Sequence, residues 1–284
     1  MKILITGATG FIGSHLIFEL LKNKSNKIIA TSKSTNKAMK FGWYSKVKYI
    51  EFDFNNYKDE NLYSLFEKPD QIIHLAWNNL SDVKSPKHLN ETLFNHYKFI
   101  KNMVAAGLKE IVVTGTCFEY GMVEGSLSEN LEANPINSYG KAKNKLREMI
   151  VDLKKKYNFT YKWIRVFYVY GERQSETSLM YLLDLAIKNK DKEFNMSSGE
   201  QLRDFLYIDD VVKYIGLIAD QKIYINQVIN CCSGRPISVK NLVMKYLKKK
   251  KYNLKLNLGY YPYPDFEPMS FWGDRFYLDK LLKK

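Results

Sequence analysis

The chain has 284 residues, of which 45% are hydrophobic, 14% aromatic and 26% charged. These values are those of a globular protein with a full core, and they exclude a short chain held together by disulfides. The formal net charge is +14, but only six of the 44 basic residues are Arg and the Lys are spread along the chain. We therefore interpret the charge as a solvated Lys-rich surface that also attracts small anions, and we expect no nucleic-acid partner.

Membrane and metal sites are not predicted. No segment approaches the roughly 20 consecutive apolar residues that a membrane helix needs, and no export signal is recognisable. Cys117, Cys231 and Cys232 lack the spacing of metal ligands. We expect reduced thiols in a cytoplasmic protein with no membrane partner.

Strands and helices are predicted to alternate along the first part of the chain. An apolar β-branched run at residues 2–6 is followed, after Gly13, by apolar residues at helical spacing. The later predicted elements are strands at 28–31, 49–52 and 71–75, a helix at 93–107 that ends on glycine, a strand at 110–114, a helix at 139–156 capped by Ser138, a strand at 162–166 and a helix at 178–188. This alternation predicts an α/β fold with a doubly wound parallel Rossmann sheet.

The pattern becomes less regular after Arg165, where aromatic residues, glycines and prolines interrupt it. We predict a dinucleotide-binding domain over residues 1–166, to which a segment of about 208–235 returns. A smaller C-terminal substrate-binding lobe is predicted from 167–207 and 236–284.

A glycine-rich turn separates the first strand from the first helix. Gly7 suits the tight turn, Gly10 allows the backbone to approach a pyrophosphate, and Gly13 allows close packing of helix and strand. The N–H groups at the helix start attract an anion. The alternative is a turn needed only for packing, but the flanking strand and helix favour dinucleotide binding.

The end of the second strand bears on the choice of cofactor. Sites for NAD place an Asp or Glu there, whereas this chain has Ser32 and Lys33. Both can bind a 2′-phosphate, so NADP is favoured and NAD stays possible; Lys33 could also be an ordinary surface lysine. Asp53, after the third strand, either reaches the adenine or caps a turn.

A Tyr and a Lys lie four residues apart in the predicted helix at 139–156. Tyr139 and Lys143 therefore share one face. An ammonium nearby is expected to lower the phenol pKa from about 10, so that Tyr139 can exchange a proton with a carbonyl or alcohol. Thr116, at the carboxyl edge of the sheet, can share the same substrate oxygen.

Together these motifs resemble the extended short-chain dehydrogenase/reductases that act on nucleotide-sugars. The resemblance also covers His74-Leu75-Ala76-Trp77, Asn95, Tyr120-Gly121, residues 165–171 and residues 199–210. It implies a catalytic set of Thr116, Tyr139 and Lys143. It implies cofactor contacts from Gly7, Thr9, Gly10, Phe11, Ile12, Gly13, Ser32, Lys33, Asp53, Phe54, Leu75, Ala76, Trp77, Asn95, Thr114, Tyr139, Lys143 and Phe167, and substrate contacts from Thr116, Cys117, Phe118, Tyr168 and Arg203.

Departures from the family pattern reduce the number of reactions that the resemblance allows. Dehydratases of this family have Asp and Glu where this chain has Cys117 and Phe118, so dehydration is not expected. Epimerases usually keep the acidic residue on the second strand. Residues 115–122 and 262–273 resemble bacterial dTDP-4-keto-6-deoxyhexose reductases. Tyr168 stands where many relatives have Asn, and Arg203 could instead pair with Asp204 or Asp209.

The resemblance therefore implies hydride transfer from NADPH to the C4 carbonyl of a nucleotide-linked sugar, with Tyr139 as proton donor. Thr116 polarises the carbonyl and Lys143 holds the nicotinamide ribose. The alternatives are a nucleotide-sugar epimerase and a non-catalytic NADP-binding protein. The helices at 93–107 and 139–156 pair in dimers of the family, so a homodimer is expected.

Overall fold

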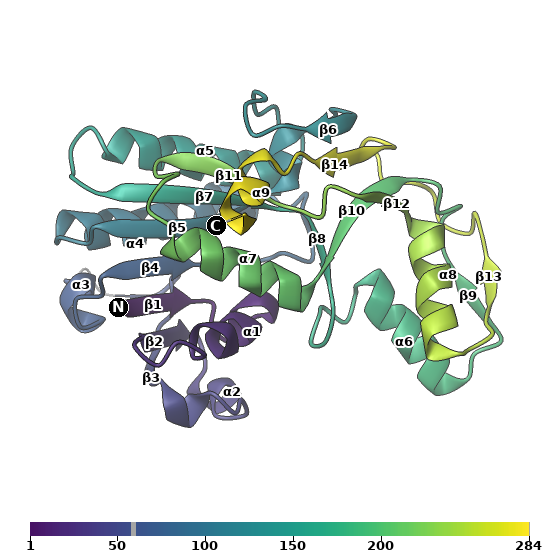
Figure 1. Ribbon diagram of the computed structural model, residues 1–284, viewed down its shortest axis with the longest axis horizontal. Helices are drawn as coiled ribbons and strands as arrows, with labels where there is room; N and C mark the ends of the chain where they lie inside the picture. The colour runs from purple at the N-terminus through teal and green to yellow at the C-terminus, as the bar shows by residue number, and fades with distance from the viewer. Residues whose placement is uncertain (58–60, 284) are drawn as a thin grey trace.

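The computed structural model describes residues 1–57 and 61–283, so Lys284 of the predicted lobe lies outside the described residues. Seven parallel strands form the large sheet (Figure 1). Their spatial order is β11 (Gln227–Cys231), β7 (Thr160–Val166), β5 (Glu110–Thr116), β4 (Gln71–His74), β1 (Lys2–Thr6), β2 (Lys27–Ser32) and β3 (Lys48–Glu51). The predicted doubly wound parallel sheet is confirmed.

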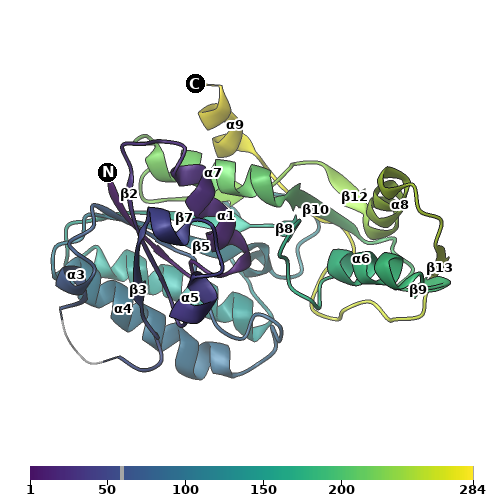
Figure 2. The ribbon, with the colours of Figure 1, turned by 90° about the horizontal axis from the view of Figure 1, so that it is seen from below.

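Helices cover both faces of this sheet, each over its own apolar core (Figure 2). One face is covered by α1 (Phe11–Leu20) and α7 (Ile208–Asp220), with the short α2 (Thr35–Ala38) and the 3₁₀ turn η1 (Tyr44–Lys46) nearby. The opposite face is covered by α3 (Leu62–Leu65), α4 (Leu93–Ala105) and α5 (Ser138–Leu153). The carboxyl ends of the strands are thereby left open at one edge, where parallel sheets bind ligands.

One predicted helix cap is wrong. Asn137 rather than Ser138 caps α5, because Asn137 has extended backbone and its Oδ1 accepts a hydrogen bond of 2.7 Å from Gly140 N. Ser138 is already helical, and its hydroxyl donates to the Lys84 carbonyl. The predicted glycine end of α4 is confirmed, since Gly107 has a φ of 118° directly after the cap residue.

A second group of elements lies beyond the carboxyl edge (Figure 1). Its own apolar core is built around α6 (Leu179–Asn189) and α8 (Val239–Lys250). The remaining strands are β8 (Tyr168–Tyr170), β10 (Leu202–Tyr207) and β12 (Pro236–Ser238) in one small sheet, β9 (Glu193–Asn195) with β13 (Lys255–Asn257), and β6 (Gly125–Leu127) with β14 (Phe271–Gly273).

The C-terminal helix returns to the large core. Leu278 and Leu281 of α9 (Phe276–Leu282) pack in the same cluster as the residues of α1 and α7. The predicted lobe range 236–284 therefore includes a helix that packs on the other unit. In the described part of the chain, no helix combines the length and the apolar character needed to cross a membrane.

Candidate active site

The glycine turn at the end of β1 has the geometry of a phosphate cradle. Gly7 has a φ of +70°, and a Cβ there would lie 2.9 Å from Ala76 N. A Cβ at Gly13 would overlap the carbonyl oxygen of Gly7. Gly10 caps α1 without any side-chain hydrogen bond, so the helix start presents backbone N–H groups beside Phe11 and Ile12. These residues fit a dinucleotide pyrophosphate.

Basic side chains surround a hollow of about 530 Å³ beside this turn. The hollow is lined by Thr9, Gly10 and Phe11, and by Lys37, Lys40 and Arg173 from two other segments. The Arg173 guanidinium lies 5.3 Å from the centre of the Phe41 ring. Among the described residues these three cations have no ion pair, and sequence reasoning did not single them out.

The two residues predicted to select the cofactor already have partners. Lys33 Nζ lies 3.1 Å from Asp53 Oδ1, and both side chains are about half exposed. The Ser32 hydroxyl contacts the Tyr49 hydroxyl at 2.9 Å. Asp53 also accepts a hydrogen bond from Asn55 N, which is the predicted turn-capping role.

The residues that follow β4 pack directly against the glycine turn. The Thr6 hydroxyl accepts hydrogen bonds from Leu75 N and Ala76 N and lies 2.9 Å from His74 Nδ1. His74 is fully buried, and burial lowers its pKa to about 3, so the ring is neutral. This arrangement fixes the backbone of 75–77 beside the cradle.

Tyr139 and Lys143 of α5 both contact Trp77, which places them at the same edge. Lys143 Nζ lies 4.0 Å from the centre of the Trp77 ring and donates to the Thr114 carbonyl at 2.8 Å. The rings of Tyr139 and Trp77 are 6.1 Å apart. Lys143 is only 1% exposed, and burial lowers its pKa to about 7. The predicted pair therefore lies together in the fold.

The expectation that Lys143 lowers the pKa of the Tyr139 phenol is wrong for the protein without cofactor. The pKa of Tyr139 is raised rather than lowered, first by burial and then by the negative charge of Glu119. A hydrogen bond with Thr116 acts in the opposite direction. The ring of Phe118, two residues after Thr116, lies 6.3 Å from the Tyr139 ring, so Tyr139 lies beside the turn that Thr116 begins. The phenol is protonated at neutral pH.

The turn that follows β5 holds Thr116 firmly. In the 3₁₀ turn η3 (Cys117–Tyr120), the Thr116 hydroxyl accepts from Phe118 N and the Glu119 carboxylate accepts from Thr116 N. Glu119 is fully buried and also accepts from Trp163 Nε1 and Arg165 Nε. Sequence reasoning missed this network, because Glu119 and Arg165 are distant in the sequence and meet only through the pairing of β5 with β7.

Aromatic side chains lie between Tyr139 and the second unit. The Phe118 ring is 6.3 Å from Tyr139, 6.4 Å from Tyr168 and 6.1 Å from Phe266. Tyr168 and Arg203 line a cavity of about 730 Å³ that Pro262 and Pro264 also border. Cys117 is buried, and burial raises the pKa of its thiol, so it cannot relay protons as an acid would.

Arg203 is paired, but not with the predicted neighbours. Its Nε and Nη2 donate to Glu267 Oε2 at 3.1 and 2.8 Å, and both side chains are largely buried. Asp204 instead accepts from Ser233 N and Gly234 N. The alternative pairing with Asp204 or Asp209 is therefore wrong, since the partner is Glu267, 64 residues away.

Three of the predicted cofactor contacts have side chains that are engaged elsewhere. Phe54 is buried and stacks on His96, with ring centres 4.8 Å apart. Phe167 is buried in a small cluster with Tyr120. Asn95 donates to Asn55 Oδ1. Any contact that Phe54 or Phe167 makes with a cofactor would come from its backbone.

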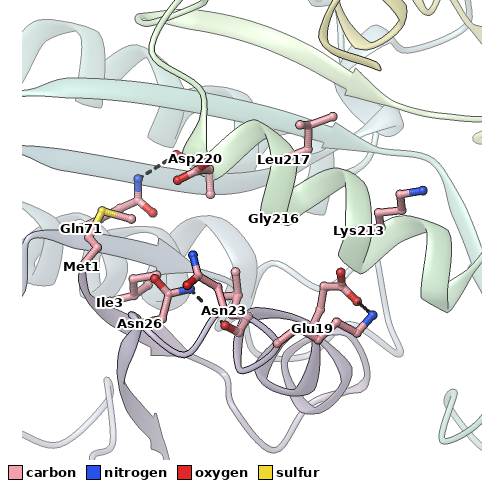
Figure 3. Close-up of a pocket in the computed structure, with 13 residues that line it drawn as sticks. Met1, Ile3, Glu19, Asn23, Asn26, Gln71, Lys213, Gly216, Leu217 and Asp220 are labelled. Carbon is pink, nitrogen blue, oxygen red and sulfur yellow. Dashed lines mark hydrogen bonds and ion pairs between the residues drawn. The ribbon is translucent and has the colours of Figure 1, made fainter. Parts of the chain in front are cut away.

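A further hollow, of about 270 Å³, lies at the opposite edge of the sheet (Figure 3). It opens between α1 and α7 and is lined by Met1, Glu19, Gln71 and Asp220. Gln71 Nε2 donates to the Ala219 carbonyl, and Glu19 pairs with Lys22. The candidate residues at the carboxyl ends of the strands do not line this hollow.

Comparison with known proteins agrees with this geometry. Residues 3–232 match the model of the NAD dependent epimerase/dehydratase family. The chain belongs to this family. A member from Aggregatibacter actinomycetemcomitans, dTDP-6-deoxy-L-talose 4-dehydrogenase (NAD(+)), is 31% identical over 96% of this chain and 99% of its own length. A Bacillus subtilis (strain 168) protein named as an uncharacterized UDP-glucose epimerase is 29% identical over 96% of this chain and 89% of its own.

A solved member of the family has the same fold throughout. UDP-glucuronic acid 4-epimerase from Bacillus cereus, solved with UDP-glucuronic acid and NAD, superposes with a TM-score of 0.84. It is 26% identical, and the alignment covers all of this chain and 93% of the epimerase. The family resemblance and the fold class predicted from the sequence are therefore confirmed.

Proposed function

We propose that this protein uses NADPH to reduce the C4 keto group of a nucleotide-linked 4-keto-6-deoxyhexose, with dTDP as the nucleotide. The observation that carries the proposal is the packing of Tyr139 and Lys143 against Trp77 beside the turn that begins at Thr116, in a site whose next two residues are Cys117 and Phe118. Elimination of water needs an acid and a base at neighbouring carbons, and neither side chain supplies one. The relative that acts on dTDP-6-deoxy-L-talose supports the nucleotide and the sugar.

The residues present define the proton path. When bound, the nicotinamide cofactor supplies or accepts the hydride. Tyr139, protonated at neutral pH, gives its proton to the C4 oxygen, and the Thr116 hydroxyl holds the same oxygen. Lys143, which donates to the Thr114 carbonyl, is proposed to hold the nicotinamide ribose.

The sugar subsite proposed beside Tyr139 favours a deoxysugar. Phe118, Tyr168 and Phe266 present ring carbons there, which suit the C6 methyl group of a 6-deoxyhexose better than a hydroxymethyl or a carboxylate. Arg203 is proposed to bind a substrate phosphate, and a diphosphate there competes with Glu267 for the guanidinium.

The preference for NADP rests on charge at the other end of the cleft. The end of β2 carries Ser32 and Lys33 and no carboxylate, and Lys37, Lys40 and Arg173 add positive charge beside the glycine turn. Lys33 is partly neutralised by Asp53, whereas Lys37, Lys40 and Arg173 have no ion pair among the described residues and outnumber Glu176, the carboxylate that lines the same hollow. In this proposal the cofactor binds on the large sheet and the sugar binds under the smaller lobe, from which α9 is excluded because it packs on the large core.

The test is a turnover assay with dTDP-4-keto-6-deoxyglucose and either NADPH or NADH. We expect oxidation of NADPH in stoichiometric amounts and slower use of NADH. Tyr139→Phe should lower kcat by about 10³-fold, because the proton donor is lost, with little change in the Kd of NADPH. Thr116→Val should lower kcat by a smaller factor than Tyr139→Phe does. Near-wild-type turnover in Tyr139→Phe would contradict the proposal, and interconversion of sugars without net cofactor consumption would identify an epimerase.

We also propose a homodimer through α4 and α5. These helices pack side by side, and Phe94 at the start of α4 is 56% exposed, which is unusual for a phenylalanine. Light scattering should give twice the mass of the chain. A Phe94→Glu variant is expected to shift the protein toward monomer.

A further inference from the structure

A buried charge lies directly behind the turn that carries Thr116. The side chains of Glu119 and Arg165 are 0% and 2% exposed, and Glu119 Oε2 lies 2.9 Å from Arg165 Nε. Removing two charges from water costs free energy that a pair of apolar residues would not require. A buried pair at this position therefore needs an explanation beyond filling space.

The local structure is arranged around the Glu119 carboxylate. Oε1 accepts from Thr116 N and from Trp163 Nε1, both at 2.9 Å. A Cβ at residue 115 would overlap both Glu119 Oε1 and Trp163 Nε1, so only glycine leaves room. The carboxylate thus connects β7 to the backbone of Thr116, and the ring of Phe118 in the same turn lies 6.3 Å from the Tyr139 ring.

The groups that face Tyr139 come from several elements. Glu119 and Cys117 belong to η3, Thr116 ends β5, Lys143 follows on α5, and His88 of η2 (His88–Thr92) lies 5.3 Å away between ring centres. Burial raises the pKa of Cys117 and lowers the pKa of His88, so both are neutral near pH 7. Among these described groups, Glu119 supplies the negative charge.

We infer that Glu119 is a positioning residue for the proposed reduction: its carboxylate holds the Thr116 turn and supplies a fixed negative charge behind the Tyr139 hydroxyl. A negative charge raises the pKa of the phenol, in the same direction as burial, and opposes the lowering of the Lys143 pKa by burial. The phenol then stays protonated at higher pH, which favours donation to a carbonyl over abstraction from an alcohol. The inference rests on the proposed function.

The test is the pH profile of the reductase with NADPH and dTDP-4-keto-6-deoxyglucose. In Glu119→Gln the amide oxygen can still accept from Thr116 N, so the charge is removed while the turn is kept. We expect the alkaline limb of kcat to move down by about one pH unit, with KM values within about twofold. Glu119→Asp keeps the charge and should leave the limb closer to that of the wild type.

A second variant covers the case in which Arg165, left unpaired, unfolds the protein. Glu119→Gln combined with Arg165→Gln removes both charges and should move the limb in the same direction but by less, because the lost Arg165 cation offsets part of the lost negative charge. Glu129→Gln is the matched control, because Glu129 is also a buried carboxylate bonded to a backbone N–H, that of Asn230. The alkaline limb of kcat in Glu129→Gln should stay at the wild-type pH.

The outcomes separate this inference from the proposed function. Absence of any wild-type turnover refutes the reductase itself. With turnover present, a limb that stays in place in both the single and the double Gln variants overturns the role of Glu119. A double variant that does not fold also overturns it, because the pair would then serve only the fold.

Discussion

Two lysines are buried against the large sheet, Lys143 of α5 near the carboxyl ends of the strands and Lys162 of β7 near their amino ends. Lys143 is 1% exposed and Lys162 is 2% exposed, and each donates to one backbone carbonyl, Thr114 O at 2.8 Å and Ala219 O at 2.7 Å. Burial lowers the pKa of Lys143 to about 7 and that of Lys162 to about 8. By burial and pKa alone, the two residues are equivalent.

Their neighbours distinguish them. Lys162 faces the carboxylates of Glu110 and Asp220, and its ammonium bonds to the last turn of α7, where a cation is favourable. Lys143 also lies near a carboxylate, that of Glu119, but its ammonium packs on the Trp77 ring, which the Tyr139 phenol also faces. A perturbed lysine therefore indicates function only when groups that can react lie beside it at an open edge of the sheet.

The largest effect expected from this contrast is on turnover. Lys143→Met should lower kcat by about 100-fold, because the ribose contact and the positive charge beside Tyr139 are both lost. Stopped-flow or steady-state oxidation of NADPH measures it. A kcat within twofold of the wild type would show that Lys143, like Lys162, is only structural.

The sequence predicts Lys143 far better than it predicts the groups around it. The positions four apart in a helix and the alternation of strands are local patterns, so the sheet, the cradle at Gly7 and the pair on α5 could be predicted. Glu119 with Arg165 and Arg203 with Glu267 are contacts between distant segments, 46 and 64 residues apart, and no spacing indicates them. The sequence predicts Ser138 as the cap of α5, but the cap is Asn137, because its backbone is extended whereas that of Ser138 is helical, and residue type alone does not indicate this difference.

The stability of the cofactor-free protein should depend on pH through Lys143. Its pKa is about 7 when folded and about 10.5 when unfolded, so between these values the unfolded chain binds more protons. Burial of Lys143 therefore lowers stability most at and below pH 7, and the loss disappears as the pH rises to 10.5. We expect Lys143→Met to raise Tm by a few degrees at pH 7.

Calorimetry at pH 7 and pH 9.5 should show this gain shrinking with pH. A constant difference in Tm would mean that the ammonium is not held neutral by burial, and that its contacts offset the loss of hydration at every pH.

The smallest effect on turnover and stability is expected for Lys162→Met. This variant tests whether Lys162, unlike Lys143, has only a structural role. Turnover should stay within twofold, since the Lys162 ammonium lies at the edge opposite Tyr139. The Ala219 carbonyl keeps its second donor, Gln71 Nε2 at 2.9 Å, beside the hollow of Figure 3. Loss of the charge-assisted bond to α7 lowers the free energy of unfolding, whereas removal of a buried lysine with a pKa of about 8 raises it, so urea denaturation at pH 7 should show a net change below about 1 kcal/mol. A large loss of kcat with unchanged stability would instead mean that the two edges of the sheet are coupled, and that position in the fold does not separate these lysines.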